Sequence, residues 1–170
     1  IEAAVELGVP FSTAMRSLTS FPGVSRRMTE HFKNSKLCLI EDYAHHPTEL
    51  SASLSALRKR FPDRQLIVVF QPHRYARLER YLEEFGEILR DMTDLVIVVP
   101  VFSAWTEKSA ISSQMLVQDI GPKAHYTEAA WDQVALQALH YCRPPTVLAV
   151  IGAGDINKII PEIVRCLPVQ

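Results

Sequence analysis

The sequence has 170 residues, of which 48% are hydrophobic and 22% charged, and its formal net charge is −1 at pH 7. This length suits one well-buried core with a small appendage, and no apolar run approaches the roughly 18 residues of a membrane helix. Because the net charge is close to zero, we exclude long-range attraction to nucleic acid or to an anionic membrane as the basis of function.

The first segment of the chain has helical spacing. The apolar positions between Glu2 and Leu18 are interrupted at Gly8-Val9-Pro10, which predicts a helix, a turn and a second helix. The turn-forming residues Phe21-Pro22-Gly23 end this segment. We therefore place a domain boundary there, with residues 1–24 on one side and residues 25–170 on the other.

After this boundary, apolar runs of strand length alternate with amphipathic helical stretches. The runs are continuously hydrophobic, which indicates burial on both faces, as in a parallel sheet covered by helices. The sequence therefore predicts a Rossmann-like, doubly wound α/β domain, with a mostly parallel sheet of about six strands and helices on both faces. The expected strands are Leu37–Ile40, Leu66–Phe70, Leu95–Val101 and Val147–Ile151, with weaker ones at Arg27–Phe32 and Ala124–Tyr126. The expected helices are Thr48–Phe61, Arg77–Met92, Ser112–Ile120, Ala129–Tyr141 and Asp155–Leu167.

A dense polar cluster follows the first strong strand. Residues 41–49, Glu-Asp-Tyr-Ala-His-His-Pro-Thr-Glu, place acids, a phenol and two imidazoles together at the start of a helix. Capping of that helix by His46 or Thr48 is the plainer explanation. We favour a functional site, because parallel sheets bind ligands at the carboxyl ends of their strands. No metal site is expected, because adjacent histidines seldom reach one ion and no further Cys/His cluster follows.

A second cluster, Gln71-Pro72-His73-Arg74-Tyr75-Ala76-Arg77, follows the strand Leu66–Phe70. Arg74 and Arg77 are three residues apart, so they share a face if a helix has begun. Two guanidiniums on one face can bind a carboxylate or phosphate through paired hydrogen bonds. A solvated basic turn is the alternative, but both clusters are expected at the same edge of the sheet, which favours an anion-binding site.

The last strand ends in the glycine turn Gly152-Ala153-Gly154-Asp155-Ile156. Such a turn at the start of a helix can bind phosphate on its backbone N–H groups. The residues match neither GxGxxG nor GxxxxGK[ST], and Asp155 would repel phosphate or simply cap the helix. Close packing of helix on strand explains the turn at least as well.

The remaining polar and aromatic residues favour structural explanations. Cysteines 38, 142 and 166 form neither a CxxC pair nor a disulfide framework, which favours a reducing compartment, the cytoplasm. The chain begins at Ile1 without a signal peptide, so we expect it to be part of a longer protein. Packing roles are expected for Phe85, Phe102, Trp105 and Trp131, and structural roles for His31, His125 and His140.

The strand-end clusters also resemble motifs of the Mur ligase family. Residues 42–49 resemble the D-Y-[GA]-H-H-P-T-E motif of its alanine-adding members, and residues 70–77 are similar to their F-Q-P-H-R-[YF]-[TS]-R motif. Phe21-x-Gly23-Val24-x-Arg26-Arg27 resembles the hinge between the central and final domains, and residues 152–156 resemble the late glycine turn. The resemblance runs in matching order over about residues 1 to 165.

The resemblance implies a ligase of peptidoglycan-precursor synthesis that adds L-alanine to UDP-N-acetylmuramate. ATP and Mg²⁺, bound mainly by a central domain, would activate the muramyl carboxylate as an acyl phosphate, which the amine of L-alanine attacks. Residues 1–24 would be the tail of that central domain and the hinge, and residues 25–170 the C-terminal, amino-acid-binding domain packed against it. The implied site residues are Arg27 and Asp42 toward ATP, and Tyr43, His45, His46, Arg74 and Arg77 around L-alanine, with His73 and Asp155 in support.

Two features depart from the family pattern. The family usually has an aromatic-Ala-Gly-Glu segment after the strand that ends near Val101, where this chain has Phe102-Ser103-Ala104-Trp105-Thr106-Glu107. The chain also lacks a GxxxxGK[ST] loop and a nucleotide-sugar domain. We therefore expect no catalytic residue of the acyl-phosphate chemistry in it, and no turnover by it alone.

Three alternatives stay open. A sister ligase that attaches a preformed murein tripeptide shares the first motif, but its second motif lacks the His73-Arg74-Tyr75 pattern. A non-catalytic small-ligand-binding module of the same ancestry would keep the fold without the reaction. A metal-dependent hydrolase using Asp42, His45 and His46 would need a more complete ligand shell.

Overall fold

The computed structural model describes residues 1–21, 23–103, 105 and 109–168. Within these ranges, six strands form one sheet in the order β1-β2-β6-β3-β4-β5. β1 runs antiparallel to β2, and the other neighbouring pairs are parallel. This sheet confirms the predicted doubly wound, mostly parallel architecture. The strands are β1 (Thr29–Lys33), β2 (Leu37–Asp42), β3 (Gln65–Phe70), β4 (Leu95–Val98), β5 (Ala124–Tyr126) and β6 (Thr146–Ile151).

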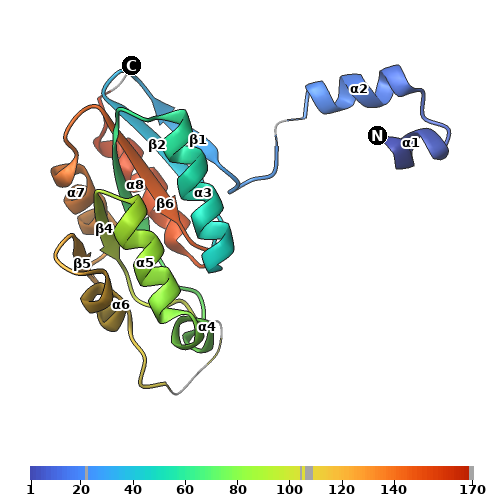
Figure 1. The fold of residues 1–170 in the computed structure, drawn as a ribbon. Coiled ribbons are helices and arrows are strands. Elements are labelled where there is room, and N and C mark those ends of the chain that lie inside the picture. Colours follow the sequence, from blue (N-terminus) through green and yellow to red (C-terminus); the bar gives the residue numbers. More distant parts are fainter. Residues whose placement is uncertain (22, 104, 106–108, 169–170) are drawn as a thin grey trace.

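Helices cover both faces of the sheet (Figure 1). On one face α3, α4, α5 and α6 pack against strand residues such as Ile40 and Val68. On the other face α7 and α8 pack against residues such as Leu39 and Val69. Neighbouring strand residues point to opposite faces, and both faces are buried, so the strands are hydrophobic throughout. The helices are α3 (Pro47–Arg60), α4 (Tyr75–Arg80), α5 (Leu82–Met92), α6 (Ser113–Ile120), α7 (Trp131–Tyr141), the 3₁₀ turn η1 (Ile156–Lys158) and α8 (Ile159–Cys166).

The position of β6 between β2 and β3 locates the ligand-binding edge of the sheet. The chain leaves β2 for α3 on one face, whereas it leaves β6 for η1 and α8 on the other. A crevice forms at the carboxyl ends of neighbouring strands whose connections leave toward opposite faces. Asp42 and Phe70 both stand in register with Ile151 at this edge. The segments that follow these three strands therefore meet there.

The start of α3 shows why the helix begins where it does. Pro47 takes the first helical position, where its missing N–H costs nothing. The Nδ1 atom of His46 accepts the N–H of Thr48 at 3.3 Å, and Oε2 of Glu49 accepts the N–H of His46 at 3.3 Å. This capping arrangement fixes the first turn beside the sheet edge. Burial of the leucines on the inner face adds about 1.5–3 kcal/mol for each side chain. These leucines are Leu50, Leu54 and Leu57.

Two predicted helices are each divided in the structure. The helix expected at Arg77–Met92 is broken at Tyr81, which has φ −125° and ψ 27° and separates α4 from α5. The ring of Tyr81 lies edge-on to His46 with centroids 4.8 Å apart, a contact between distant segments that local spacing does not reveal. The helix expected at Asp155–Leu167 begins as η1 and becomes α-helical only at Ile159.

The amino-terminal segment confirms the predicted helix, turn and helix. α1 (Glu2–Glu6) and α2 (Phe11–Thr19) stand apart from the sheet in Figure 1. The large apolar side chains of this segment are exposed, with Leu7, directly after α1, at 85% and Phe11 of α2 at 61%. Pro22 of the expected boundary lies outside the described residues. Among the helices that are described, none combines the length and the apolar character needed to cross a membrane.

Candidate functional site

Backbone pairing continues past the ends of the strands and draws the strand-end segments together. The N–H of Gly152 donates to the carbonyl of Asp42 at 3.0 Å, and the N–H of Gln71 donates to that of Ile151 at 3.0 Å. Beyond β4, the N–H of Phe102 donates to the carbonyl of Pro72 at 2.8 Å. The two polar clusters, the glycine turn and the loop after β4 thus share one edge of the sheet.

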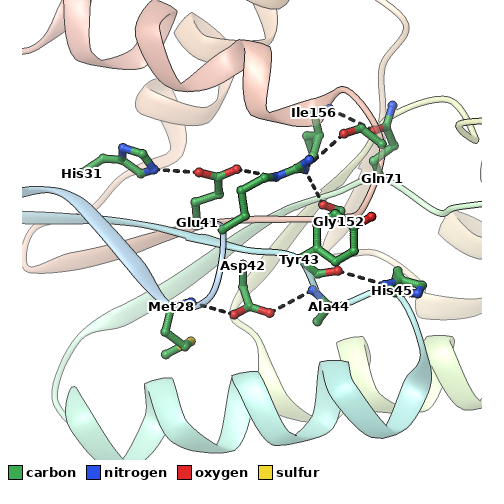
Figure 2. A network of polar contacts seen from close by, with 12 residues as sticks. Met28, His31, Glu41, Asp42, Tyr43, Ala44, His45, Gln71, Gly152 and Ile156 are labelled. Carbon is green, nitrogen blue, oxygen red and sulfur yellow. Dashed lines mark hydrogen bonds and ion pairs between the residues drawn. The ribbon is translucent and has the colours of Figure 1, made fainter. Parts of the chain in front are cut away.

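Asp42 is buried at this edge, with 3% of its surface exposed. Its Oδ2 accepts the N–H of Met28 at 2.8 Å and its Oδ1 accepts the N–H of Ala44 at 2.9 Å (Figure 2). Oδ1 also accepts the hydroxyl of Ser53 at 2.9 Å. Three internal donors therefore bind this carboxylate. Asp42 anchors the loop after β2 to α3 and to the residues that precede β1.

Glu41 holds the other side of the same strand end. Its Oε1 accepts Nε of Arg26 at 2.8 Å, and its Oε2 lies 2.8 Å from Nε2 of His31, as Figure 2 shows for the histidine. Nη2 of Arg26 also donates to the carbonyl oxygens of Gly152 and Gly154, at 2.8 and 3.1 Å. Arg26 therefore connects the residues before β1 with β2 and the glycine turn.

Tyr43 lies between cations and an imidazole. The guanidinium carbons of Arg26 and Arg27 lie 4.9 and 5.5 Å from the centroid of its ring, within range of cation–π attraction. The ring of His45 meets it edge-on at 5.4 Å. The exposed side chain of Arg27 thus lies at the site edge beside Tyr43.

His45 is oriented through one ring nitrogen. Its Nδ1 lies 3.0 Å from the carbonyl oxygen of Tyr43 and 3.2 Å from Oε2 of Glu49. Two oxygen acceptors at Nδ1 favour the tautomer with its proton there, which leaves a lone pair on Nε2. Burial raises the pKa of Glu49, but hydrogen bonds from the backbone N–H groups of His45 and His46, together with the positive charge of Arg27, outweigh burial and hold it below its usual value. An ionised Glu49 in turn keeps His45 in place.

The second cluster faces the first. The rings of His45 and His73 meet edge-on with centroids 5.7 Å apart. Nη1 of Arg77 lies 3.2 Å from Nδ1 of His73 and donates to its carbonyl oxygen at 3.1 Å. A guanidinium only donates, so Nδ1 of His73 is the acceptor and the ring proton belongs on Nε2. Arg77 thereby sets both the orientation and the tautomer of His73.

Arg74 caps α4 in an unusual backbone conformation, with φ 69° and ψ 130°. Its N–H donates to the carbonyl of Phe102 at 2.8 Å, and its guanidinium carbon lies 4.4 Å from the ring centroid of Trp105. His46, Arg74, Arg77 and Tyr81 help to line a small open cavity of about 310 Å³. His46 therefore borders the arginine pair while it also caps α3.

The glycine turn is held by packing and by Gln71, which is buried. Oε1 of Gln71 accepts the N–H of Ile156 at 3.0 Å, and its Nε2 donates to Oδ1 of Asp155 at 3.0 Å. A Cβ on Gly154 would stand 2.5 Å from Cγ of Phe102 and 2.4 Å from Oε1 of Gln71. The second carboxylate oxygen of Asp155 pairs with Lys158 at 3.1 Å. These contacts favour the packing explanation of the turn.

The structure brings most of the predicted site residues together. Tyr43, His45, His73, Arg74 and Arg77 converge on one side of the edge. Asp42 and Asp155 are present at the edge, but internal donors bind their carboxylates.

No individual site role was predicted for Arg26, Glu41 and Gln71, although they belong to the sequence motifs, and Phe102 was predicted only to pack. The available signal was position, since Glu41 and Gln71 are polar residues at the ends of buried strands. Of the atypical loop, Ala104, Thr106 and Glu107 lie outside the described residues. In the part of the chain that is described, no group of three His, Cys, Asp or Glu side chains could hold a metal ion.

Comparison with known proteins decides the family. The family model for the Mur ligase, glutamate ligase domain matches residues 26–154. The chain belongs to the Mur ligase family. Among curated relatives, the UDP-N-acetylmuramate–L-alanine ligase of Lactobacillus johnsonii is 40% identical over 151 residues, covering 88% of this chain and 33% of the relative. That of Desulfitobacterium hafniense is 33% identical over 164 residues, covering 94% and 36%.

Solved structures show the same fold. The UDP-N-acetylmuramate–alanine ligase of Thermotoga maritima superposes with a TM-score of 0.75 at 25% identity, over 97% of this Mur ligase chain and 35% of that protein. A murein peptide ligase from Psychrobacter arcticus gives 0.65 at 16% identity, over 99% and 36%, which shows the fold alone. This Mur ligase chain spans about a third of the length of the curated relatives that it matches.

Proposed function

We propose that this chain is the amino-acid-binding domain of a cytoplasmic, ATP-dependent ligase that joins L-alanine to UDP-N-acetylmuramate. The observation that carries the proposal is the meeting of two histidines and two arginines from separate strand ends. His45 contacts His73, Arg77 holds His73, and Arg74 follows directly. The relatives named UDP-N-acetylmuramate–L-alanine ligase support it, since they match over most of the chain.

The two halves of the site suit the two ends of an amino acid. Arg74 and Arg77 offer guanidinium N–H donors, which bind a carboxylate with two parallel hydrogen bonds. On the opposite side, Nε2 of His45 carries a lone pair and Tyr43 a phenol, which suit an amine. The amine must lose a proton before it attacks, and the lone pair of an imidazole can accept that proton.

The proposed reaction proceeds through an acyl phosphate. ATP phosphorylates the muramyl carboxylate and leaves as ADP, the amine attacks the acyl carbon, and phosphate departs as the amide forms. This domain would position the amine for attack. When the acyl group is already activated, such positioning accounts for a large part of the rate acceleration. Mg²⁺ would be bound mainly by a separate ATP-binding domain, as the resemblance to the family implies.

ATP contact from this chain would come mainly through Arg27. Its exposed guanidinium lies beside Tyr43 at the edge, where it can reach ribose or phosphate oxygens. Asp42 would act there by fixing the loop, because its carboxylate is bound by three internal donors. We assign Asp155 a supporting role of the same kind, through Gln71.

Residues 1–24 would be the tail of the ATP-binding domain and the hinge to this one. The support is the apolar surface of α1 and α2, which includes exposed Leu7 and Phe11 and lacks a partner within the described residues. Packing of the ATP-binding domain against this surface would bury it. Contiguous exposed apolar surface of this kind commonly marks an interaction site.

The test is an assay of amide formation by the full-length enzyme with UDP-N-acetylmuramate, ATP and a panel of amine substrates. We expect phosphate release that depends on L-alanine, with glycine, L-serine and D-alanine as weaker substrates. Preference for a murein tripeptide would instead assign the sister activity. Failure of every amine, with L-alanine binding retained, would assign a non-catalytic binding module. The 170-residue chain alone is the negative control and should release no phosphate in this assay.

A further inference from the structure

The loop after β4 brings two aromatic side chains to the site. The ring of Phe102 stacks on His73, with centroids 5.6 Å apart and planes 13° from parallel. The ring of Trp105 lies under the guanidinium carbon of Arg74 at 4.4 Å. Two consecutive residues of the second cluster therefore each have an aromatic partner from this loop.

Arg74 is the site residue that most needs to be held in place. Its side chain is exposed, and its positive φ is rare for residues with a side chain. Among the described residues, its guanidinium donates no hydrogen bond to a protein acceptor, and the indole of Trp105 lies against its face. An unheld arginine loses much rotamer freedom when it binds a ligand, and that loss weakens binding.

A stacked indole holds a guanidinium without using its hydrogen bonds. The attraction acts through the flat face of the cation, whereas all five N–H donors lie in its plane. Contact with Trp105 thus restricts the Arg74 side chain and leaves its donors available. A phosphate or carboxylate can therefore accept hydrogen bonds in the plane of the Arg74 guanidinium while the indole of Trp105 lies against its face.

The described residues that precede Trp105 in the loop make further contacts. The hydroxyl of Ser103 donates to the carbonyl oxygen of Trp105 at 2.6 Å. Phe102 pairs with the second cluster through its N–H to Pro72 and its carbonyl to Arg74, both at 2.8 Å. The small residue Gly154 leaves the room that the Phe102 ring occupies. Phe102, at the start of the loop, is therefore fixed at the sheet edge.

We propose that Trp105 is a positioning residue, whose indole holds the Arg74 guanidinium in place to bind the carboxylate of the amino acid substrate. The inference rests on the proposed function, in which Arg74 binds that carboxylate. It gives a role to the loop where this chain departs from the family's aromatic-Ala-Gly-Glu pattern.

The first test compares Trp105→Leu and Trp105→Phe in the full-length enzyme. Loss of the aromatic face should raise the KM for L-alanine about three- to tenfold, while kcat and the KM for ATP stay within about twofold. Trp105→Phe keeps an aromatic face and should recover most of the loss. Because Trp105 is 54% exposed, both variants should unfold at nearly the wild-type temperature, which thermal melts check.

The second test asks whether Trp105 acts through Arg74. Arg74→Ala should raise the KM for L-alanine, and adding Trp105→Leu to it should have little further effect, because coupled residues are non-additive. Additive effects, or an unchanged KM in Trp105→Leu while Arg74→Ala raises it, would overturn the inference and leave the proposed function standing. An unchanged KM in Arg74→Ala would instead overturn the carboxylate assignment itself, and with it the role of Trp105.

Discussion

The Nε atom of Arg26 donates to Oε1 of Glu41 at 2.8 Å, and this ion pair is largely buried. The same guanidinium donates to the carbonyls of Gly152 and Gly154, so it closes the carboxyl edge of the sheet from the side of β1. Arg26 also has a positive φ of 60°. The pair therefore holds a backbone conformation that would otherwise be unfavourable just before the first strand.

Replacing Arg26 by Met should lower the free energy of unfolding by about 2–4 kcal/mol, because a buried carboxylate and two carbonyls lose their donor. Urea denaturation of the 170-residue chain measures this loss. Arg165→Met is the matched control, since the exposed pair of Arg165 with Glu162 should contribute less than about 1 kcal/mol. Equal losses in the two variants would contradict a structural role for the Arg26–Glu41 pair.

Replacing Gly154 by Ala should destabilise the chain by about 1–3 kcal/mol, because the new methyl group has no room beside Phe102 and Gln71. Displacement of Phe102 should also raise the KM for L-alanine in the full-length enzyme. Gly121→Ala is the control. Gly121 has φ 93° and no atom within 4 Å of an added Cβ, so the substitution strains the backbone at a position outside the site without a steric clash. It should lose stability with an unchanged KM.

Local pattern was sufficient to predict most of the fold. Strands such as Leu66–Phe70 are buried on both faces, so their continuous hydrophobicity identifies them in the sequence. The break between α4 and α5 was missed, because it accompanies the contact of Tyr81 with His46, about 35 residues earlier in the sequence. Contacts of that kind depend on the tertiary arrangement and leave no periodic signal.

The candidate site was predictable to the extent that carboxyl ends of parallel strands share an edge. That rule places the two motifs together, and the rings of His45 and His73 do meet. The rule does not give the sheet order, in which β6 and β4 both neighbour β3. Phe102 reaches Gly154 because of that order, so the sequence predicts that its ring packs but not which residues it contacts.

The charge on Glu49 should make stability depend on pH. Its pKa is lowered in the folded chain, so the unfolded chain binds its proton more readily. The stabilisation is therefore fully present above the usual value of 4.5 and is lost as pH falls through the lower, folded value. Glu49→Gln should melt about 1–3 °C below wild type at pH 7, and this difference should shrink as pH falls below 4.5. A difference that stays constant as pH falls would argue against ionisation as the cause.

Replacing Arg77 tests whether it belongs to the proposed amino-acid site. Arg77→Ala removes the donor to Nδ1 and to the carbonyl of His73, and it removes one of the two guanidiniums proposed to bind the substrate carboxylate. The KM for L-alanine should rise about 10- to 100-fold, because a charge-assisted hydrogen bond contributes about 1.5–3 kcal/mol. The KM for ATP should change by less than about twofold, because Arg77 is not proposed to contact the nucleotide.

Arg77→Lys keeps the charge but not the planar fork, so it should recover only part of the loss. Arg165→Ala, which removes an exposed arginine far along the chain, should leave both constants unchanged. If Arg77→Ala raised both KM values equally, Arg77 would belong to the general closure of the enzyme rather than to the amino-acid site.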